Sequence, residues 1–511
     1  MLRLTWVQPE DLLGHELRQA AQDGRNASGV ERRWREAGGH PPPERAGASP
    51  PPQDPRLRAL ANTLLDELAS AQSPLRALEP TPLSEIKRLT PNWPAPRALH
   101  PARPALEDKG RGGLGAAPPE TPGTKGLHAS WLGRAVGCLL GKPVEKLPLD
   151  GIRAIAKSTS NWPLNTWFTH RNLPRDVAER YPWNRRSRPT SLAENIDGMP
   201  EDDDLNYPLL GLLLLQRHGA EFTTADVAQL WLDELPAGRT FTAERIAYRN
   251  LLDGMEPPDT AVHHNPFREW IGAQIRADVF GWTNPGDPAR AAELAYRDAT
   301  LTHTANGVYG EMFVAAAIAH AAARTATTTH TAAPTATTPH TATPHRTTPT
   351  TVTTPTTPTA PTIHTTLNAG LSVIPPDSRY AQAIRFGIET ARAEPTGTPA
   401  GFASAVDTLH ARYAHDHHWV HVLPNAALLA AALTHADGDF TGSVCRAVSG
   451  GWDTDSNGAT AGSIAGLLAG SPDAIDDRWT TPLKNRLATS VADFDGIGFD
   501  ELARLTQEAR T

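Results

Sequence analysis

Two carboxylates and a hydroxyl lie close together near the carboxyl end of the chain. Asp453, Asp455 and Ser456 directly follow the pair Gly450-Gly451 and Trp452. Oxygen atoms at this spacing can converge on one hard divalent cation, because such cations prefer oxygen ligands. The alternative is a helix N-cap with solvated acids, so the motif alone does not establish a metal site. A second acidic cluster elsewhere in the chain would favour the metal.

The run from Glu201 to Asp204 is such a cluster, and a strongly apolar segment follows it. Pro208 is expected in the first turn of a helix, which predicts a buried helix that begins near Asn206. Adjacent like charges before a buried helix repel one another, and a divalent cation is the simplest compensation. The two acidic clusters together therefore predict a binuclear centre for Mg²⁺ or Mn²⁺.

Two segments that must position these acids carry glycine at every fourth residue. The glycines are Gly133, Gly137 and Gly141 in the first segment and Gly458, Gly462, Gly466 and Gly470 in the second. This spacing places each set on one face of a helix, although an interior glycine costs a helix about 1 kcal/mol relative to alanine. We therefore expect the two helices to pack with their backbones in close approach. Pro143 ends the first helix and leaves Glu145 on a loop, where a solvated acid is the alternative to a functional one.

The rest of the chain predicts an all-α protein with an extension before its main body. Residues 1–125 read as a helical extension, with helices at 12–23, 55–71 and 84–88 and a Pro/Gly-rich linker over 97–125. Residues 126–511 form the main body, a compact multi-helix bundle. Its expected later helices include 289–302, 312–323, 379–393, 401–413, 425–436, 482–489 and 499–510. Residues 324–366 are a Thr/Pro/Ala-rich insertion that cannot bury enough apolar surface to order itself.

Bulk composition excludes several classes of function. The chain has 511 residues, a net charge of -8 and a pI of about 6.2, so it has no basic field to hold nucleic acid. Its two cysteines, Cys138 and Cys445, allow no disulfide framework and indicate no thiolate zinc site. The histidines of segment 415–421 fit a helix boundary better than a zinc site. The N-terminus has no apolar signal core and no apolar run approaches about 20 residues, which predicts a soluble cytoplasmic protein. The protein is also expected to be a monomer.

Five segments in this order resemble the ADP-ribosylglycohydrolase family, which includes the dinitrogenase-reductase-activating glycohydrolases. They are Gly-Arg-Ala-Val-Gly-Cys-Leu-Leu-Gly-Lys-Pro-Val-Glu (133–145), the acid triplet, Ile-Gly-Ala-Gln-Ile-Arg (271–276), the segment around His303, and Gly-Gly-Trp-Asp-Thr-Asp-Ser-Asn (450–457). The resemblance spans roughly residues 127–490. It implies an all-helical fold, a centre of two Mg²⁺ ions (Mn²⁺ being possible), and hydrolysis of the N- or O-glycosidic bond at C1″ of ADP-ribose.

The resemblance also implies the metal ligands. Asp453, Asp455 and Ser456 match one ligand motif of the family. Asp202, Asp203 and Asp204 align with the family's Thr-Asp-Asp, and a register one residue earlier would use Glu201, Asp202 and Asp203 instead. In either register an acid replaces the family's threonine, and Cys138 replaces an aspartate that is common in the family.

Catalytic and substrate-binding roles follow from the same resemblance. Glu145 matches a glutamate that is the catalytic acid or base in some members, and Asp203 and Asp453 are the other candidates for moving the proton. The residues that fall where the family grips the ribose and diphosphate are Gly272, Gln274, Arg276, His303, Asn306 and Tyr309.

The expected substrate is an ADP-ribosylated protein or an ADP-ribose-containing small molecule, with the acceptor left open. Two other functions remain as alternatives at this stage. One is metal-dependent hydrolysis of a nucleotide phosphoester, which would release phosphate. The other is a non-catalytic module that binds ADP-ribose.

Overall fold

The computed structural model describes residues 5–42, 54–95, 121–327 and 360–510. Within these ranges the regular elements are helices, and extended pairing is limited to the isolated bridges Met199–Leu487 and Trp270–His421. The prediction of an all-α fold is confirmed. Most of the predicted linker at 97–125 and of the predicted insertion at 324–366 lies outside the described residues. None of the described helices is long and apolar enough to cross a membrane.

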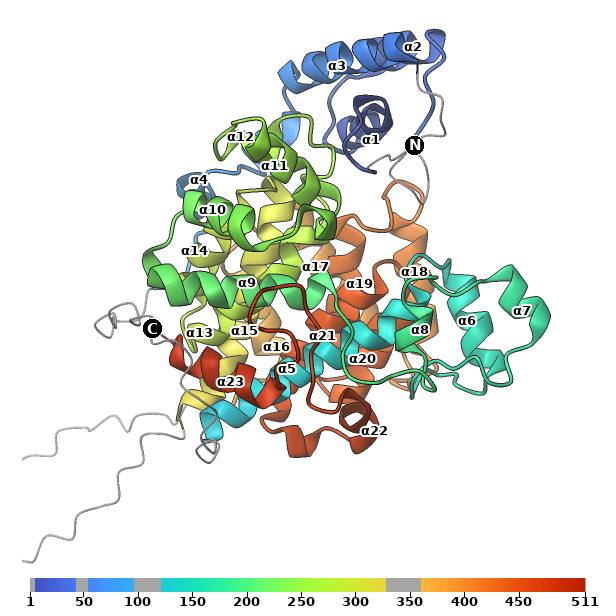
Figure 1. Cartoon of the computed structure of the whole chain (residues 1–511), viewed down its shortest axis with the longest axis vertical. Coiled ribbons are helices and arrows are strands. Elements are labelled where there is room, and N and C mark those ends of the chain that lie inside the picture. Colours follow the sequence, from blue (N-terminus) through green and yellow to red (C-terminus); the bar gives the residue numbers. More distant parts are fainter. Residues whose placement is uncertain (1–4, 43–53, 96–120, 328–359, 511) are drawn as a thin grey trace, which may run out of the picture.

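The helices follow one another from the extension into the main body (Figure 1). Those of the first 95 residues are α1 (Pro9–Gln22), α2 (Ser28–Glu36), α3 (Pro55–Ser70) and α4 (Leu83–Leu89). Those up to residue 300 are α5 (Pro122–Gly141), α6 (Leu149–Ser158), α7 (Arg175–Arg180), α8 (Arg188–Ser191), α9 (Asp203–His218), α10 (Thr224–Glu234), α11 (Thr242–Leu252), α12 (Asp259–Val262), α13 (Asp278–Thr283) and α14 (Pro288–Ala299). The later ones are α15 (Ala305–Thr327), α16 (Ile363–Leu371), α17 (Arg379–Ala393), α18 (Phe402–Tyr413), α19 (Val422–His435), α20 (Phe440–Ser449), α21 (Thr454–Ala469), α22 (Asp477–Thr480) and α23 (Phe499–Glu508). Short 3₁₀ turns are η1 (Pro74–Ala77), η2 (Lys142–Val144), η3 (Gly219–Glu221), η4 (Ala237–Arg239), η5 (Ile271–Arg276), η6 (Pro472–Ala474) and η7 (Thr481–Leu483).

The two glycine-striped helices, α5 and α21, lie against each other at the centre of the main body (Figure 1). A Cβ atom added to Gly137 would lie 1.8 Å from the carbonyl oxygen of Gly458, and one added to Gly133 would lie 2.1 Å from that of Gly462. These pairings run in opposite directions along the two helices, so the helices are antiparallel. The predicted close approach is confirmed. Gly470 differs, because it adopts a left-handed conformation at the end of α21 and meets no neighbouring atom.

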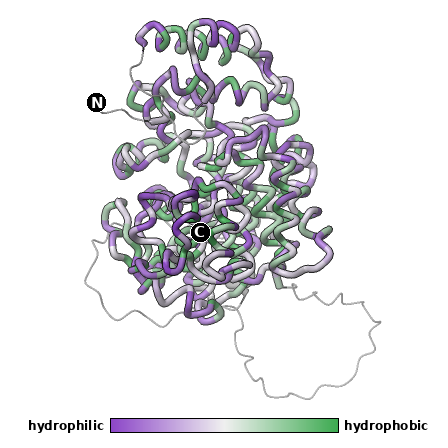
Figure 2. Tube along the Cα trace, turned by 90° about the vertical axis from the view of Figure 1, so that its right-hand side faces the viewer, coloured by the Kyte–Doolittle hydropathy of each residue, from purple (hydrophilic) through white to green (hydrophobic). Residues whose placement is uncertain are grey.

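Two further helices of the main body, α15 and α19, are almost entirely buried and contact α21. Every residue from 306 to 319 in α15 is buried, as is every residue from 422 to 434 in α19. Helices that are buried on all sides need small and apolar residues all round, which explains their alanine-rich sequences. Figure 2 shows long hydrophobic stretches of chain within the body, among hydrophilic ones.

Helix α9 begins at Asp203, three residues earlier than predicted from Pro208. Pro208 therefore lies inside the helix, where its missing N–H leaves the carbonyl oxygen of Asp204 without its usual partner. The Arg134 side chain of α5 supplies that partner, because its Nε donates to the Asp204 carbonyl oxygen at 2.6 Å. The early start places the acids at the first turn of the helix instead of on a loop before it.

The extension α1–α4 packs onto the body at one end of the molecule (Figure 1). Arg268 of the body pairs with Glu16 at 2.8 Å and with Asp23 at 3.0 Å, and all three side chains are nearly buried. Trp6 packs edge-on against Phe267, with ring centroids 5.4 Å apart. Buried ion pairs and aromatic contacts thus join the extension to the body.

The predicted helix at 482–489 is wrong. Only the 3₁₀ turn η7 (Thr481–Leu483) is present there, and Leu487 instead forms a bridge to Met199. This bridge uses backbone groups that a helix would have consumed, and it fixes the segment that leads into the acid run of α9.

Candidate metal centre

Two groups of side chains in the described residues could hold a metal ion. The first consists of Cys138 on α5 together with Asp202 and Asp204 at the start of α9. The ligand atoms of this group lie within 4.8 Å of one another. Asp202 is the N-cap of α9 and accepts a hydrogen bond from the backbone N–H of Asp204 at 3.0 Å. The cap fixes the direction of the Asp202 carboxylate.

The second group consists of Glu145, Asp453 and Asp455, whose ligand atoms also lie within 4.8 Å of one another. Glu145 follows the turn η2 at the end of α5, while Asp453 and Asp455 open α21. The backbone N–H of Asp453 donates to the side-chain oxygen of Asn425 at 3.1 Å. These acids therefore sit on the ends of two rigid central helices.

The two groups adjoin each other. Ser456 Oγ donates to Asp204 Oδ2 at 3.3 Å, so the first turn of α21 touches the first turn of α9. Asp202 is also close enough for its charge to raise the pKa of Asp455. The structure thus brings together the two acidic clusters that the sequence separates by about 250 residues.

Burial and mutual repulsion raise the pKa of most of these acids. Burial and the neighbouring Asp455 hold the pKa of Asp453 well above its usual value. Burial, Glu145 and Asp202 raise the pKa of Asp455 to about 7. Asp203 and Asp204 also have raised pKa values, from burial and from the charge of Asp202. The folded chain therefore holds more negative charge here than its own cations neutralise.

Two cations compensate part of that charge, and the sequence analysis missed both. Arg134 is fully buried on α5, with Nη1 donating to Asp278 at 2.7 Å and Nη2 lying 3.3 Å from Asp204. Lys142 forms an ion pair with Asp202. Burial raises the pKa of Asp202, but the charge of Lys142 and the hydrogen bonds from Lys142 and from the Asp204 backbone together outweigh it, and the net pKa is lowered. The sequence did contain a signal for Arg134, because a charged residue on an apolar, glycine-striped helix needs a buried partner of opposite charge.

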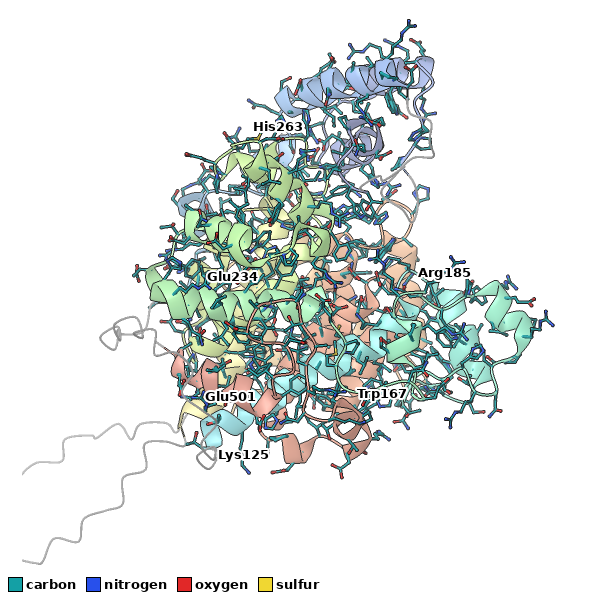
Figure 3. All side chains as sticks on the ribbon, in the orientation of Figure 1. Lys125, Trp167, Arg185, Glu234, His263 and Glu501 are labelled. Atoms are coloured by element: carbon teal, nitrogen blue, oxygen red, sulfur yellow. The ribbon has the colours of Figure 1, made fainter. Side chains whose placement is uncertain are left out.

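The environment of Glu145 was also missed. Asn184 Nδ2 donates to Glu145 Oε2 at 2.7 Å, and Lys146 Nζ lies 2.6 Å from Oε1. The same Lys146 ammonium lies 5.8 Å from the centre of the Trp419 ring. The residue after Asn184, Arg185, is labelled in Figure 3 beside the helices α6 and α8. Both oxygens of Glu145 are thus held by donors from outside the helices that carry the acids.

The residues present fit a divalent cation. The donors are carboxylate and hydroxyl oxygens, which suit Mg²⁺ or Mn²⁺. Burial raises the pKa of Cys138, so its sulfur stays a thiol and not a thiolate ligand. The charge of Lys142 lowers the pKa of Asp455 only in part, and the pKa values of both Asp453 and Asp455 stay raised.

The pKa of Asp455 predicts a pH dependence of the metal-free protein. A folded-state pKa near 7, above the unfolded value near 3.9, means that the folded state binds the proton more tightly. Stability should therefore fall as pH rises from 5 to 8, by about 2–3 kcal/mol at 1.36 kcal/mol per pKa unit. Thermal unfolding in chelator, compared with Asp455→Asn, measures this fall. The comparison is needed because buried histidines with lowered pKa values, such as His303, make the folded protein more stable as pH rises over part of the same range.

If the difference in unfolding free energy between the unmodified protein and Asp455→Asn stayed constant from pH 5 to 8, the raised pKa of Asp455 would be contradicted. Saturating Mg²⁺ should abolish the fall in the unmodified protein, because a bound cation favours the ionised carboxylates.

Three of the residues expected to bind substrate lie in the core around η5. Arg276 is 2% exposed and pairs with Glu244 at 3.1 Å and with Asp298. A side chain on Gly272 would collide with the Glu244 carboxylate. Gln274 accepts a hydrogen bond from the Tyr380 hydroxyl at 2.8 Å.

Of the other three, His303 lies beside the η5 group, 4.0 Å from Glu244, whereas Asn306 and Tyr309 contact the extension. The pKa of His303 is lowered far below its usual value by burial and by Arg276. Asn306 donates to Glu79 at 2.8 Å and to Glu269 at 2.9 Å, and the Tyr309 hydroxyl donates to the carbonyl oxygen of Pro80 at 2.5 Å. Each of the six residues thus has a structural role, and substrate binding by them stays a prediction.

Known proteins similar to this chain identify its family. Residues 125–510 match the family model of the ADP-ribosylglycohydrolases. A similar solved structure, described as an ADP-ribosylglycohydrolase-related protein complex, is 19% identical, covers 76% of this chain and 99% of its own, and has a TM-score of 0.42. Curated protein sequences give no match. Because the family model spans well over half of its length, this chain belongs to the ADP-ribosylglycohydrolase family.

Proposed function

We propose that this protein is a metal-dependent glycohydrolase that releases ADP-ribose from an ADP-ribosylated protein or small molecule. Members of its family act on ADP-ribosylated substrates. The observation that carries the proposal is the junction of the two carboxylate groups, with Glu145 in the second of them. Buried acids with raised pKa values at such a junction are typical of a functional site.

Two Mg²⁺ ions, with Mn²⁺ as a possible substitute, are the proposed cofactors. The residues that would hold them are Asp202, Asp203, Asp204, Asp453, Asp455 and Ser456. When bound, the ions would supply Lewis-acid stabilisation of ribose oxygens and an acidic water. The position of Asp204 beside Ser456 favours the register Asp202–Asp204, since Glu201 turns away to pair with Arg239 at 2.6 Å.

Glu145 is the proposed general base. Its carboxylate is oriented by Asn184 and Lys146, and its side chain is 17% exposed, so a water at the site can reach it. Glu145 would take a proton from the water whose oxygen attacks C1″. As the bond from C1″ to the acceptor breaks, the acceptor would leave with the proton that Glu145 took from the water. Asp203 and Asp453 are the remaining candidates for this proton transfer.

A turnover assay on a panel of ADP-ribosylated substrates tests the function. We expect free ADP-ribose in the presence of Mg²⁺ and none after chelation. Glu145→Gln should lower turnover by about 10²–10⁴-fold, the range that general base catalysis supplies, while it preserves stabilisation by Mg²⁺. Phosphate release in place of ADP-ribose would assign a phosphoester hydrolase. ADP-ribose binding without turnover of any substrate would assign a binding module, and either result would refute the proposal.

A further inference from the structure

A cavity lies where the extension meets the main body, away from the acidic residues of the metal centre. Its volume is about 580 Å³, which is the size of a small-molecule site. Four parts of the chain line it: α1, the start of α17, the end of α18 with the loop that follows, and Leu423 of α19. None of the carboxylates of the metal centre is among its lining residues.

Three arginines and two histidines are among the residues that line this cavity. Arg18 comes from α1, Arg379 from α17 and Arg412 from α18, and two histidines, His415 and His417, lie in the loop. The single acid among the lining residues is Asp416, and His415 Nδ1 lies 2.6 Å from its carboxylate. Arg379 is already paired with Glu79 and with Glu269. Burial lowers the pKa of His417 to about 4, so this imidazole is neutral. The positive charge that the walls offer to a ligand therefore comes chiefly from Arg18 and Arg412.

Two of the guanidinium groups are held in place. Arg379 donates to the carbonyl oxygen of Gln22 at 2.9 Å and to Glu79 at 2.7 Å. The guanidinium of Arg412 lies over the Phe386 ring, 4.4 Å from its centroid. Fixed guanidinium groups lose little entropy on binding, and their forks match the oxygens of a phosphate.

The cavity belongs to both parts of the protein. Gln22 Nε2 of α1 donates to the carbonyl oxygen of Asp416 at 2.7 Å, which closes one edge of the cavity. The loop that carries Asp416 continues to Trp419, beside the Lys146 ammonium that pairs with Glu145. A ligand here would therefore contact the extension and the loop together, and that loop reaches the metal centre.

We propose that this cavity is a second binding site, which takes a small phosphate-bearing anion through Arg18 and Arg412. The site is independent of the proposed function, because neither its residues nor its test involve turnover.

Calorimetric titration of the metal-free full chain with pyrophosphate, at fixed ionic strength, tests the proposal. We expect a Kd of about 1 mM or lower. Arg412→Gln should weaken binding at least tenfold, and Arg18→Gln with Arg412→Gln should abolish it. Arg175→Gln, on an exposed side chain of α7, is the control of equal charge and should leave the Kd unchanged.

Two further titrations show where pyrophosphate binds and which kind of phosphate compound the site prefers. Asp455→Asn should bind pyrophosphate as the unmodified protein does. ADP that binds more tightly than pyrophosphate would assign a nucleoside phosphate, and equal or weaker binding would assign inorganic phosphate groups. The proposal is overturned if pyrophosphate does not bind at about 10 mM, ten times the expected Kd. It is also overturned if Arg175→Gln weakens pyrophosphate binding as much as Arg412→Gln does, or if only Asp455→Asn weakens it.

Discussion

Asp455→Asn is expected to reduce metal-dependent release of ADP-ribose by at least about a thousandfold, which corresponds to about 4 kcal/mol of transition-state stabilisation. The ligand atoms of Asp455, Glu145 and Asp453 lie within 4.8 Å of one another. Asn457, in the same first turn of α21, donates from Nδ2 to Asn425 at 2.7 Å and fixes the helix start. Asparagine keeps the size of the side chain and an oxygen that can accept from the N–H of Ser456. It removes the negative charge that a divalent cation requires.

The same substitution should make the metal-free protein more stable at pH 8, by up to about 4 kcal/mol at 1.36 kcal/mol per pKa unit. The pKa of Asp455 near 7 means that the ionised form is disfavoured in the folded state, and asparagine removes that cost. Thermal unfolding with and without Mg²⁺ measures both effects, because the unmodified protein should gain stability from the metal and the variant should not. Loss of activity together with higher metal-free stability cannot come from unfolding.

The control for this experiment is Asp437→Asn. Asp437 is an exposed aspartate between α19 and α20, and its left-handed backbone tolerates asparagine equally well. We expect normal turnover and normal stabilisation by Mg²⁺. Unchanged turnover of Asp455→Asn at full metal loading would refute the assignment of Asp455 as a ligand.

Gly137→Ala is expected to destabilise the protein by about 3 kcal/mol or more, the upper range for overpacking a core. The new Cβ would lie 1.8 Å from the carbonyl oxygen of Gly458, and backbone atoms cannot rotate away as a side chain can. The helices α5 and α21 would have to separate. Because they carry Arg134 and Asp455 respectively, we also expect weaker stabilisation by Mg²⁺.

Gly29→Ala is the matched control, since a Cβ at Gly29 on α2 meets no atom within 4 Å. Alanine should be neutral there, or stabilising by up to about 1 kcal/mol. Chemical denaturation measured side by side distinguishes the two glycines. Equal unfolding midpoints for the two variants would show that the α5–α21 contact is not as close as the structure has it.

The periodic patterns of the sequence were sufficient to predict the central helix pair and the acidic clusters. Gly133 and Gly137 share a face because a helix repeats every 3.6 residues, and that holds wherever the helix lies. Asp453 and Asp455 are close because only one residue separates them. Both inferences depend on local geometry alone, so they did not need the rest of the fold.

Predictions of helix boundaries that depended on a single rule about neighbouring residues were wrong in two places. Pro208 was expected to open a helix, yet it lies within α9 because Arg134, 74 positions earlier, satisfies the freed carbonyl oxygen of Asp204. The helix expected at 482–489 is replaced by a turn and a bridge to Met199. In each case a distant residue supplied the hydrogen bond on which the local rule is based.

By itself, then, the sequence determined which residues could bind a metal and which helices could pack closely, since spacing along the chain sets both. The tertiary structure decided which charges meet. It placed Lys142 on Asp202, enclosed Arg276 among Glu244 and Asp298, and joined the extension to the body around a basic cavity. Charge compensation, burial and pKa depend on distances through space, and no pattern along the chain contains those distances.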